Sequence, residues 1–292
     1  MRAAAIFGLN ASEKDLRPFE RNSGATWHVG LPANPNDTDA ILIFGGDGTV
    51  HRYLPELVKL RRPVLMVPCG SGNDFARSLG LRRTRDALAA WKKFTSTGSN
   101  LRTIDLGVIT SRSAVAPCEH YFCCVGGVGL DAEVARRANQ LPRWLRAHGG
   151  YALRLLPAIF QFPPVSMKIT YDGSPGHTQP TILAAFANAP AYGGGMKIAP
   201  RAQLDDGLLD LCILRALDPF KLLCLFPTIY FGKHLRVREF EYHQTPQLKI
   251  ETAHPLDVYA DGEYVCHTPV EVSVAPRVLA VITPSPETRN YP

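Results

Sequence analysis

Long uncharged apolar stretches are missing from this sequence of 292 residues. No window of about 18 such residues occurs, because Pro, Gln or Lys interrupts the apolar segments 155–165 and 220–231. A membrane-spanning helix is therefore not expected. At the start of the chain only residues 3–9 are apolar before charged residues follow, which predicts a first strand rather than a signal peptide.

Cysteine and histidine are too few and too scattered to indicate disulfides or a zinc site. The 7 cysteines are an odd number and the 9 histidines show no zinc-type spacing. With no secretion signal we expect reduced, mostly buried thiols, and a cytoplasmic protein or one peripheral to the inner face of the cell membrane. Cys123 and Cys124 lie in an apolar segment, which predicts small buried hydrophobes.

Several phosphate-binding signatures are also absent. The chain contains neither Gly-x-x-x-x-Gly-Lys-Ser/Thr nor the catalytic-loop and metal-binding triplets of protein kinases, which excludes both of those folds. The net charge is +6 with a pI near 9.0, but no long lysine tract or aromatic-interleaved basic motif accompanies it. A nucleic-acid partner is therefore not expected.

The chain is long enough for two hydrophobic cores. Residues 1–115 alternate short apolar runs with helical patterns, which predicts a doubly wound α/β domain. Its expected strands are 3–8, 26–29, 40–44, 63–67 and 103–109, and its expected helices are 13–21 with Ser12 as N-cap, 49–60, 74–79 and 84–94.

From residue 116 to residue 276 the pattern predicts a second, mainly antiparallel β domain, because apolar runs follow one another without a helix between each pair. The expected strands are 120–125, 166–171, 181–188, 208–214, 247–251, 256–259, 270–274 and 278–282. Two helical insertions are expected, at 131–160 with a break at Pro142 and at 219–231. Residues 277–292 are expected to return to the first domain.

The strongest motif is an apolar strand that ends in Gly45-Gly46-Asp47-Gly48-Thr49 before a helix begins. Glycines let backbone amides approach an anion closely, and the helix adds its N-terminal dipole. Asp47 suits a place near Mg²⁺ or near the reacting hydroxyl. A plain strand-to-helix turn with Asp47 as a capping residue remains the alternative.

A second apolar strand leads into a second polar turn, which contains Gly70, Ser71, Asn73 and Asp74. Both turns should lie at the same carboxyl edge of the sheet, where open α/β sheets bind ligands. Ser71 offers a hydroxyl to a phosphate, and Asn73 and Asp74 offer polar groups near a helix start. Turn and capping hydrogen bonds alone are the alternative.

With these two motifs the sequence resembles the diacylglycerol kinase catalytic-domain superfamily, which includes bacterial diacylglycerol kinases, YegS-like lipid kinases and sphingosine kinases. The resemblance covers nearly the whole chain. It rests on six segments in the family's order: residues 45–49, 68–76, 105–107, 126–132, 205–210 and 261–263. It implies an NAD kinase-like, doubly wound α/β N-terminal domain and a mainly antiparallel β-sandwich C-terminal domain with helical insertions.

The resemblance also implies ATP and Mg²⁺ as cofactors. It places the ATP site on Gly45, Gly46, Asp47, Gly48, Thr49, Val50, His51, Gly70, Ser71, Asn73 and Asp74. The magnesium site would use the Asp206 carboxylate with backbone oxygens at Gln203 and Leu208, a ligand set that suits a hard cation. From the residues alone, a type I turn between two strands is the alternative for this segment.

The turn Asp261-Gly262-Glu263 is, by the same resemblance, the source of the catalytic base. In the family this segment faces the nucleotide across the interdomain cleft, and its acidic group is proposed to take the proton of the lipid hydroxyl. We name Glu263 as the first candidate and Asp261 as the second, with Asp47 as a further catalytic residue. A tight acidic hairpin turn is the alternative.

The sequence thus predicts an ATP- and Mg²⁺-dependent kinase for the hydroxyl of a diacylglycerol-like or sphingoid-like lipid. Basic, apolar segments at 141–156 and 219–234 suggest transient contact with a membrane surface, with packing on their own sheet as the alternative. A kinase of a soluble polyol or nucleotide and a catalytically inactive nucleotide-binding regulator remain alternatives, and a homodimer is one option for the oligomeric state.

Overall fold

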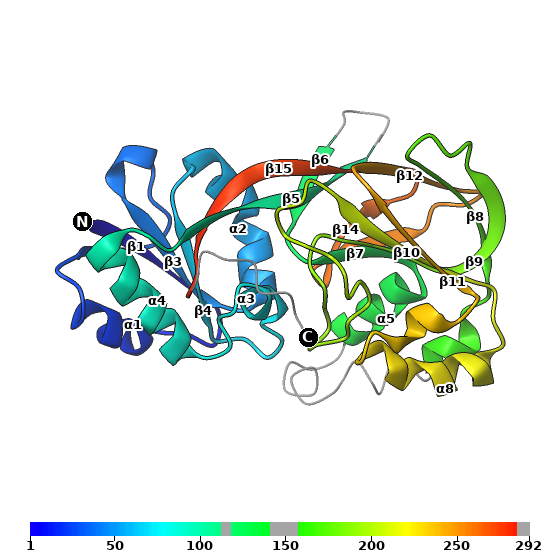
Figure 1. Ribbon diagram of the computed structural model, residues 1–292, viewed down its shortest axis with the longest axis horizontal. Coiled ribbons are helices and arrows are strands. Elements are labelled where there is room, and N and C mark those ends of the chain that lie inside the picture. Colours follow the sequence, from blue (N-terminus) through cyan, green and yellow to red (C-terminus); the bar gives the residue numbers. More distant parts are fainter. Residues whose placement is uncertain (112–117, 141–156, 285–292) are drawn as a thin grey trace. The chain divides into compact units, whose positions relative to one another are not determined.

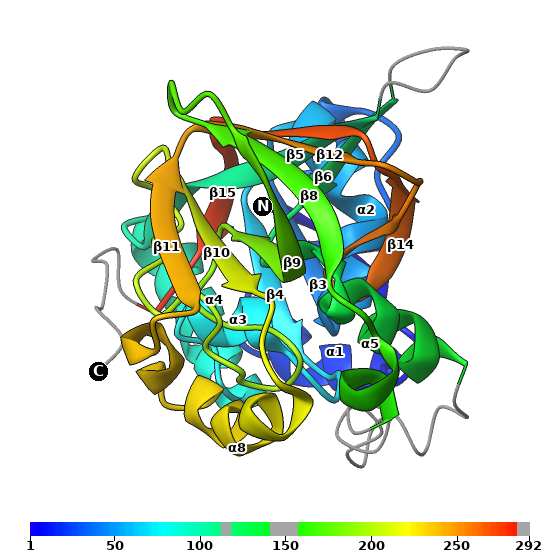
Figure 2. The ribbon, with the colours of Figure 1, turned by 90° about the vertical axis from the view of Figure 1, so that its right-hand side faces the viewer.

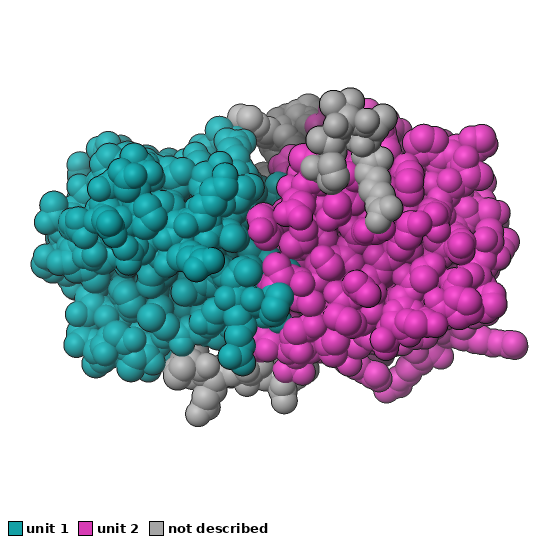
Figure 3. Space-filling view, turned by 90° about the horizontal axis from the view of Figure 1, so that it is seen from above, with its two compact units in different colours: residues 1–106, 276–292 teal, residues 107–275 magenta. Residues whose placement is uncertain are grey.

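The structure is a computed structural model that describes residues 1–111, 118–140 and 157–284. The chain divides into two compact units (Figures 1 and 3): unit 1 comprises residues 1–106 and 276–292, and unit 2 comprises residues 107–275. The sequence predicted a first boundary after residue 115, whereas this division falls within a strand. None of the helices in the described ranges is both long enough and apolar enough to cross a membrane.

Unit 1 is built on a parallel sheet with helices between its strands (Figure 1). Its elements are β1 (Arg2–Phe7), α1 (Glu13–Glu20), β2 (Thr26–Val29), η1 (Pro35–Asp37), β3 (Ala40–Gly45), α2 (Asp47–Leu60), β4 (Val64–Pro68), α3 (Asp74–Ser78), α4 (Thr84–Thr97), the start of β5 (Leu101–Ser111) and the end of β15 (Val270–Ile282). The strand order is β2-β1-β3-β4-β15, with parallel pairing throughout. The predicted α/β fold is confirmed.

The core of unit 1 forms around β3, in which every residue is buried. Strands covered by helices on both faces are apolar throughout rather than alternating, as the run Ala-Ile-Leu-Ile-Phe shows. Helix α1 starts after its predicted N-cap, Ser12, and buries Leu16 and Phe19. The ring of Phe19 meets the ring of Phe44 edge-on at 5.2 Å, so the helix is fixed to the end of the strand that carries the first glycine motif.

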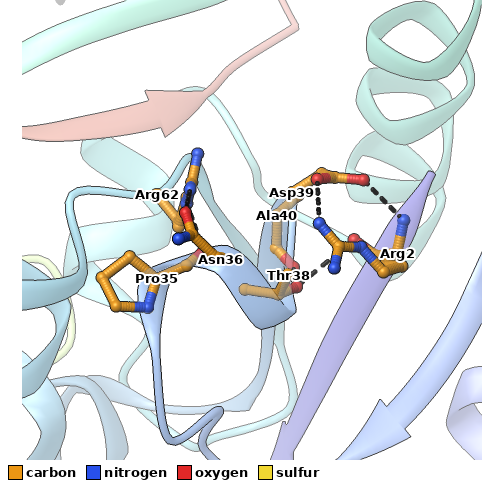
Figure 4. A network of polar contacts seen from close by, with 7 residues as sticks. All are labelled: Arg2, Pro35, Asn36, Thr38, Asp39, Ala40 and Arg62. Atoms are coloured by element: carbon orange, nitrogen blue, oxygen red, sulfur yellow. Dashed lines mark hydrogen bonds and ion pairs between the residues drawn. The ribbon is translucent and has the colours of Figure 1, made fainter.

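The connection between β2 and β3 is short and contains prolines, and it forms only the single 3₁₀ turn η1 (Figure 4). Hydrogen bonds from two other segments hold it. Arg62 Nε donates to the Pro35 carbonyl at 2.7 Å, and the Arg2 backbone N–H donates to the Asp39 carboxylate at 2.8 Å. This amide hydrogen bond holds the pKa of Asp39 below its usual range. The chain therefore passes from β2 to β3 without the extra helix that a longer connection would provide.

Unit 2 is a mainly antiparallel β domain (Figure 2). Its elements are β6 (Cys118–Phe122), β7 (Val125–Gly129), α5 (Leu130–Asn139), β8 (Val165–Tyr171), β9 (His177–Ala187), β10 (Leu209–Arg215), α8 (Pro219–Ile229), η2 (Lys233–Arg236), β11 (Phe240–Thr245), β12 (Gln247–Thr252), β13 (Asp257–Ala260), β14 (Glu263–His267) and the remaining parts of β5 and β15. The long strand β9 pairs with β7, β8 and β10.

The core of unit 2 depends on aromatic rings that lie over glycines of the neighbouring strand. Phe122 and Phe186 meet edge-on at 5.5 Å. A Cβ atom at Gly107 would come within 1.9 Å of Phe122, and one at Gly126 within 2.2 Å of Phe186. These two glycines are therefore required for packing, since any side chain there would displace a fully buried ring.

Two predicted strand boundaries were wrong for identifiable reasons. The segment 120–125 is not one strand, because the chain bends at residues 123–124 between β6 and β7. Residues 270–282 form one strand rather than two, because Arg277 adopts a left-handed φ of 53° and its N–H donates to buried Asp105 at 2.7 Å. Pro276 therefore does not end the strand. Strands β11 and β14 were not predicted, and the segment 141–156 lies outside the described residues.

Candidate active site

The first glycine motif turns from β3 directly into α2, which begins at Asp47, two residues earlier than predicted. Gly45 is required because a Cβ atom there would lie 2.6 Å from the Thr49 hydroxyl oxygen. The 14-residue helix starts at this turn, so its N-terminal amides and dipole favour an anion here. The turn thus has the properties of a phosphate-binding loop.

The second polar turn follows β4 and is locked by one asparagine. Asn73 takes a left-handed φ of 56°; its carbonyl oxygen accepts from the Gly70 N–H at 2.9 Å, and its amide donates to the Gly70 carbonyl at 2.6 Å. Ser71 lies exposed at the tip of the turn, and the buried Asp74 carboxylate pairs with Arg77 at 3.3 Å. Asparagine is among the few residues that adopt this backbone conformation readily.

The two turns are packed against each other at one edge of the sheet. Strands β3 and β4 are adjacent and parallel, with Gly45 opposite Pro68. A Cβ atom on Gly70 would lie 2.6 Å from the Gly46 Cα atom, so both glycines serve the contact between the turns. The predicted binding segments 45–51 and 70–74 therefore form one continuous surface in unit 1, although nucleotide binding there stays a prediction.

Asp47 connects the two turns through hydrogen bonds. One carboxylate oxygen accepts from the Asp74 N–H and the other from the Phe75 N–H, each at 3.0 Å. These amides belong to the first turn of α3, so Asp47 acts as a capping group for a helix that follows the other strand. The carboxylate therefore has a structural role, and its place near Mg²⁺ or the hydroxyl stays a prediction.

In unit 2 the turn 261–263 joins β13 to β14 and rests on the bend at residues 123–124. Asp261 has a left-handed φ of 51°, and its carboxylate accepts from the Cys123 N–H at 2.9 Å and the Cys124 N–H at 2.8 Å. Asn139 donates to the Gly262 carbonyl at 2.9 Å. Glu263 begins β14 with its side chain exposed. Asp261 therefore anchors the turn, and Glu263 extends from it.

The predicted magnesium segment is an exposed turn before β10. One Asp206 carboxylate oxygen accepts from the Leu208 N–H at 3.1 Å, and Gln203 is exposed nearby in the sequence. Asp210 at the end of the same motif is fully buried, and burial raises its pKa to about 6, while Tyr242 and Gln244 donate hydrogen bonds to it. The carboxylate and backbone oxygens of this turn fit a hard cation such as Mg²⁺.

Sequence reasoning gave no role to a cavity within unit 2, whose wall is formed by residues of its sheet and of helices α5 and α8. Its empty volume is about 660 Å³, including space open to solvent. Apolar side chains dominate its wall, among them Leu130 and Val134 of α5 and Leu222, Phe226 and Ile229 of α8. Such a cavity suits a hydrocarbon chain. The sequence signal that could have indicated this cavity was a single acid next to an apolar run, since Asp131 directly follows Leu130.

Two polar groups face this apolar cavity together. The Tyr192 hydroxyl donates to one Asp131 carboxylate oxygen at 2.5 Å. Burial raises the pKa of Asp131 to about 6, and the Tyr192 hydrogen bond opposes the shift. The pair can orient a hydroxyl or other polar head while the rest of a ligand lies among aliphatic side chains.

The raised pKa of Asp131 predicts a pH-dependent stability difference for Asp131→Asn. The pKa of Asp131 is higher in the folded chain, at about 6, than the value of 3.8 for a free carboxyl, so the protonated carboxyl stabilises the folded chain. This contribution to the free energy of unfolding is complete below pH 3.8 and is lost as the pH rises through about 6. Asn stays neutral and can still accept from Tyr192. We expect the Tm of the variant, relative to the Tm of the native chain, to be higher at pH 8 than at pH 4. A pH-independent difference, measured by calorimetry, would contradict this.

Comparison with known proteins decides the family. Residues 14–109 match the family model described as the diacylglycerol kinase catalytic domain. Residues 125–283 match the model described as the YegS C-terminal NAD kinase beta sandwich-like domain. The chain belongs to the diacylglycerol kinase family. The resemblance inferred from six short segments is confirmed, and both units carry a domain of this family.

Relatives support the same membership, and solved structures share the fold. The diacylglycerol kinase of Mycobacterium tuberculosis is 34% identical over 263 residues, which is 88% of this chain and 81% of the relative. That of Bacillus subtilis is 27% identical over 264 residues, covering 90% and 83%. A diacylglycerol kinase structure from Bacillus anthracis superposes with a TM-score of 0.68 at 19% identity, covering 97% of this chain and 96% of that one.

An NAD kinase from Archaeoglobus fulgidus, solved in complex with ATP, shares the fold with a TM-score of 0.53 at 13% identity, covering 97% of this chain and 94% of that one. This likeness confirms the NAD kinase-like architecture expected for the diacylglycerol kinase family. In this member of the family, the glycine turns belong to unit 1 and the Asp-Gly-Glu turn belongs to unit 2. Their joint action in one site stays a prediction from the sequence.

Proposed function

We propose that this chain transfers the γ-phosphoryl group of ATP, with Mg²⁺, to the hydroxyl of a diacylglycerol-like or sphingoid-like lipid. The observation that carries the lipid specificity is the apolar cavity of unit 2 with the Asp131 and Tyr192 pair on its wall. A soluble polyol would gain nothing from such a cavity, because its hydroxyl groups would lose water without finding partners.

The glycine turns of unit 1 are proposed to hold the phosphates of ATP. Backbone N–H groups at the start of α2 and the hydroxyls of Thr49 and Ser71 are suitable donors. Phosphoryl transfer depends mainly on positioning and on neutralising charge over the phosphoryl oxygens. The rigid packing of the two turns therefore contributes directly, because it fixes the donors before ATP binds.

Mg²⁺ is proposed to bind through the Asp206 carboxylate and the backbone oxygens of Gln203 and Leu208. When bound, the ion supplies positive charge that offsets the charge of the triphosphate. The oxygen ligands match the preference of Mg²⁺ for oxygen, and the exposure of Gln203 and Asp206 leaves room for retained water.

Glu263 is proposed as the base that accepts the proton of the lipid hydroxyl, with Asp261 as the second candidate. The Asp261 carboxylate already accepts hydrogen bonds from two backbone amides, so both of its oxygens are engaged in holding the turn. Glu263 is exposed and continues from the anchored turn. This division of roles explains why the motif contains two acids.

Contact with a membrane surface is proposed for the end of unit 2 that carries α8. Large apolar side chains are exposed there: Phe160 at 47%, Phe220 at 69% and Phe231 at 72%. Tyr230, exposed at 40%, also lines the cavity, so an exposed aromatic side chain belongs to the cavity wall. Lys233 lies 5.9 Å from the Phe231 ring centre and adds positive charge. Aromatic and basic side chains together suit the lipid interface.

A substitution that fills the cavity tests this assignment. Val134→Phe adds bulk on the cavity wall of α5, so we expect the KM for a long-chain lipid acceptor to rise about tenfold, roughly the effect of 1.4 kcal/mol of lost binding. A short-chain acceptor in free solution should be affected far less. KM values for acceptors of graded chain length in mixed micelles provide the measurement.

The matched control is Val29→Phe, the same change at a position of unit 1 that is 52% exposed. It should leave KM for every acceptor unchanged. Equal losses for short and long acceptors with Val134→Phe would show that the cavity does not hold the acyl or sphingoid chain.

A further inference from the structure

The bend between β6 and β7 brings two adjacent thiols to the carboxylate of the Asp-Gly-Glu turn. The sulfur atoms of Cys123 and Cys124 are 4.0 Å apart, and the Cys123 sulfur lies 3.4 Å from an Asp261 carboxylate oxygen. Ligand atoms of all three residues lie within 4.8 Å of one another. This is the one such group of three found among the described residues.

Two of these separations are close to the edges of a tetrahedral zinc site. Zinc–sulfur bonds of about 2.3 Å and zinc–oxygen bonds of about 2.0 Å put two sulfurs about 3.8 Å apart and a sulfur and an oxygen about 3.5 Å apart. The observed separations are 4.0 and 3.4 Å. The third separation, from the Cys124 sulfur to the carboxylate, is at most 4.8 Å, so an ion can take all three ligands if these side chains draw together. A fourth position stays open for water.

We propose that Cys123, Cys124 and Asp261 form a binding site for a thiophilic divalent cation of the Zn²⁺ type. Thiolates select soft and borderline metals over Mg²⁺, so this site and the oxygen-lined turn at Asp206 choose different ions. The sequence gave no sign of this group of three, because the carboxylate lies 138 residues after the first cysteine.

The burial of the site favours stable binding once the ion has entered. Both cysteines are at most 2% exposed, whereas Asp261 is half-buried and offers the entry side. Two thiol protons leave when two zinc–sulfur bonds form, so binding weakens as the pH falls. In the metal-free chain the same thiols are small buried hydrophobes, which is compatible with the packing around them.

Metal binding would act on catalysis through the anchored turn, an effect that rests on the proposed function. The Asp261 carboxylate holds the turn by accepting two amides, and Glu263 follows two residues later. A cation that takes an Asp261 oxygen competes with these amides and shifts the turn. Zn²⁺ is therefore expected to inhibit lipid phosphorylation, reversibly on chelation.

The test uses the full chain, stripped with a chelator and titrated with Co²⁺, whose bonds to thiolates give a charge-transfer absorption band. We expect one Co²⁺ per chain with a thiolate band, displaced by one equivalent of Zn²⁺. Cys123→Ala and Cys124→Ala should each weaken the Zn²⁺ affinity at least about 100-fold, more than the loss of an outer-shell partner. Zn²⁺ should also raise the Tm of the native chain but not of the double variant.

Cys212→Ala is the matched control, since Cys212 is equally buried but lies in β10 outside the cluster. It should bind Co²⁺ like the native chain. The absence of a thiolate band, or a band that persists in the Cys123→Ala/Cys124→Ala double variant, would overturn the site. Binding without any effect on phosphorylation would overturn only the coupling to the turn. A chain that phosphorylates no lipid at any metal concentration would refute the proposed function and leave the binding result intact.

Discussion

Glu263→Gln is expected to reduce lipid phosphorylation about 10²- to 10⁴-fold, the usual contribution of a positioned general base. Gln keeps the size of the side chain but cannot accept the proton of the hydroxyl. The ATP dissociation constant should stay unchanged, because the proposed phosphate donors all belong to unit 1. Single-turnover kinetics with a saturating lipid acceptor, together with equilibrium nucleotide binding, provide the measurement.

Asp261→Asn is the informative companion, because it separates the two acids of the turn. Asn can still accept one backbone amide, but its NH₂ group cannot accept the other, so the bend at residues 123–124 should lose stability. The expected result is a lowered Tm with a smaller kinetic loss than in Glu263→Gln. A native Tm with abolished turnover in Asp261→Asn, while Glu263→Gln stays active, would make Asp261 the base instead.

Asp47→Ala is expected to weaken ATP binding about tenfold or more and to lower the free energy of unfolding by about 2 kcal/mol. Its carboxylate accepts from the Asp74 and Phe75 amides, so removal leaves two part-buried donors without this acceptor. The two glycine turns then lose the group that joins them. Calorimetric titration with ATP and denaturant unfolding measure the two effects.

Asp86 provides the control for Asp47, because its carboxylate also accepts two backbone amides, those of Arg82 and Arg83. It lies at the start of α4, outside the glycine turns. Asp86→Ala should cost some stability but leave the affinity for ATP unchanged. If both variants lost ATP affinity equally, general destabilisation rather than the joined turns would explain the Asp47 result.

The architecture of unit 1 could be predicted because each of its signals is local. A fully apolar strand such as β3, a following glycine turn and a capped helix after Ser12 are all encoded by neighbouring residues. The adjacency of the two turns followed from the general rule for parallel sheets. The role of Asp47 did not, because its hydrogen-bond partners lie 27 and 28 residues away.

Unit 2 was less predictable because its important contacts are long-range. The bend that divides β6 from β7 accompanies the contact with Asp261, more than 130 residues later in the chain. The continuous strand β15 depends on the hydrogen bond from the Arg277 N–H to Asp105, 172 residues apart. The cavity is lined by α5, α8 and strand residues that no spacing rule brings together. Such features require the folded chain.

The most direct test of the account is transfer of the γ-phosphoryl group from radiolabelled ATP to lipid by the purified full chain. Diacylglycerol and a sphingoid base are each presented in mixed micelles with Mg²⁺, next to glycerol and a nucleoside as soluble acceptors. We predict label in the lipid extract of at least one lipid reaction, and its loss in Glu263→Gln. Label only in a soluble acceptor, or ATP binding with no labelled product, would contradict the account.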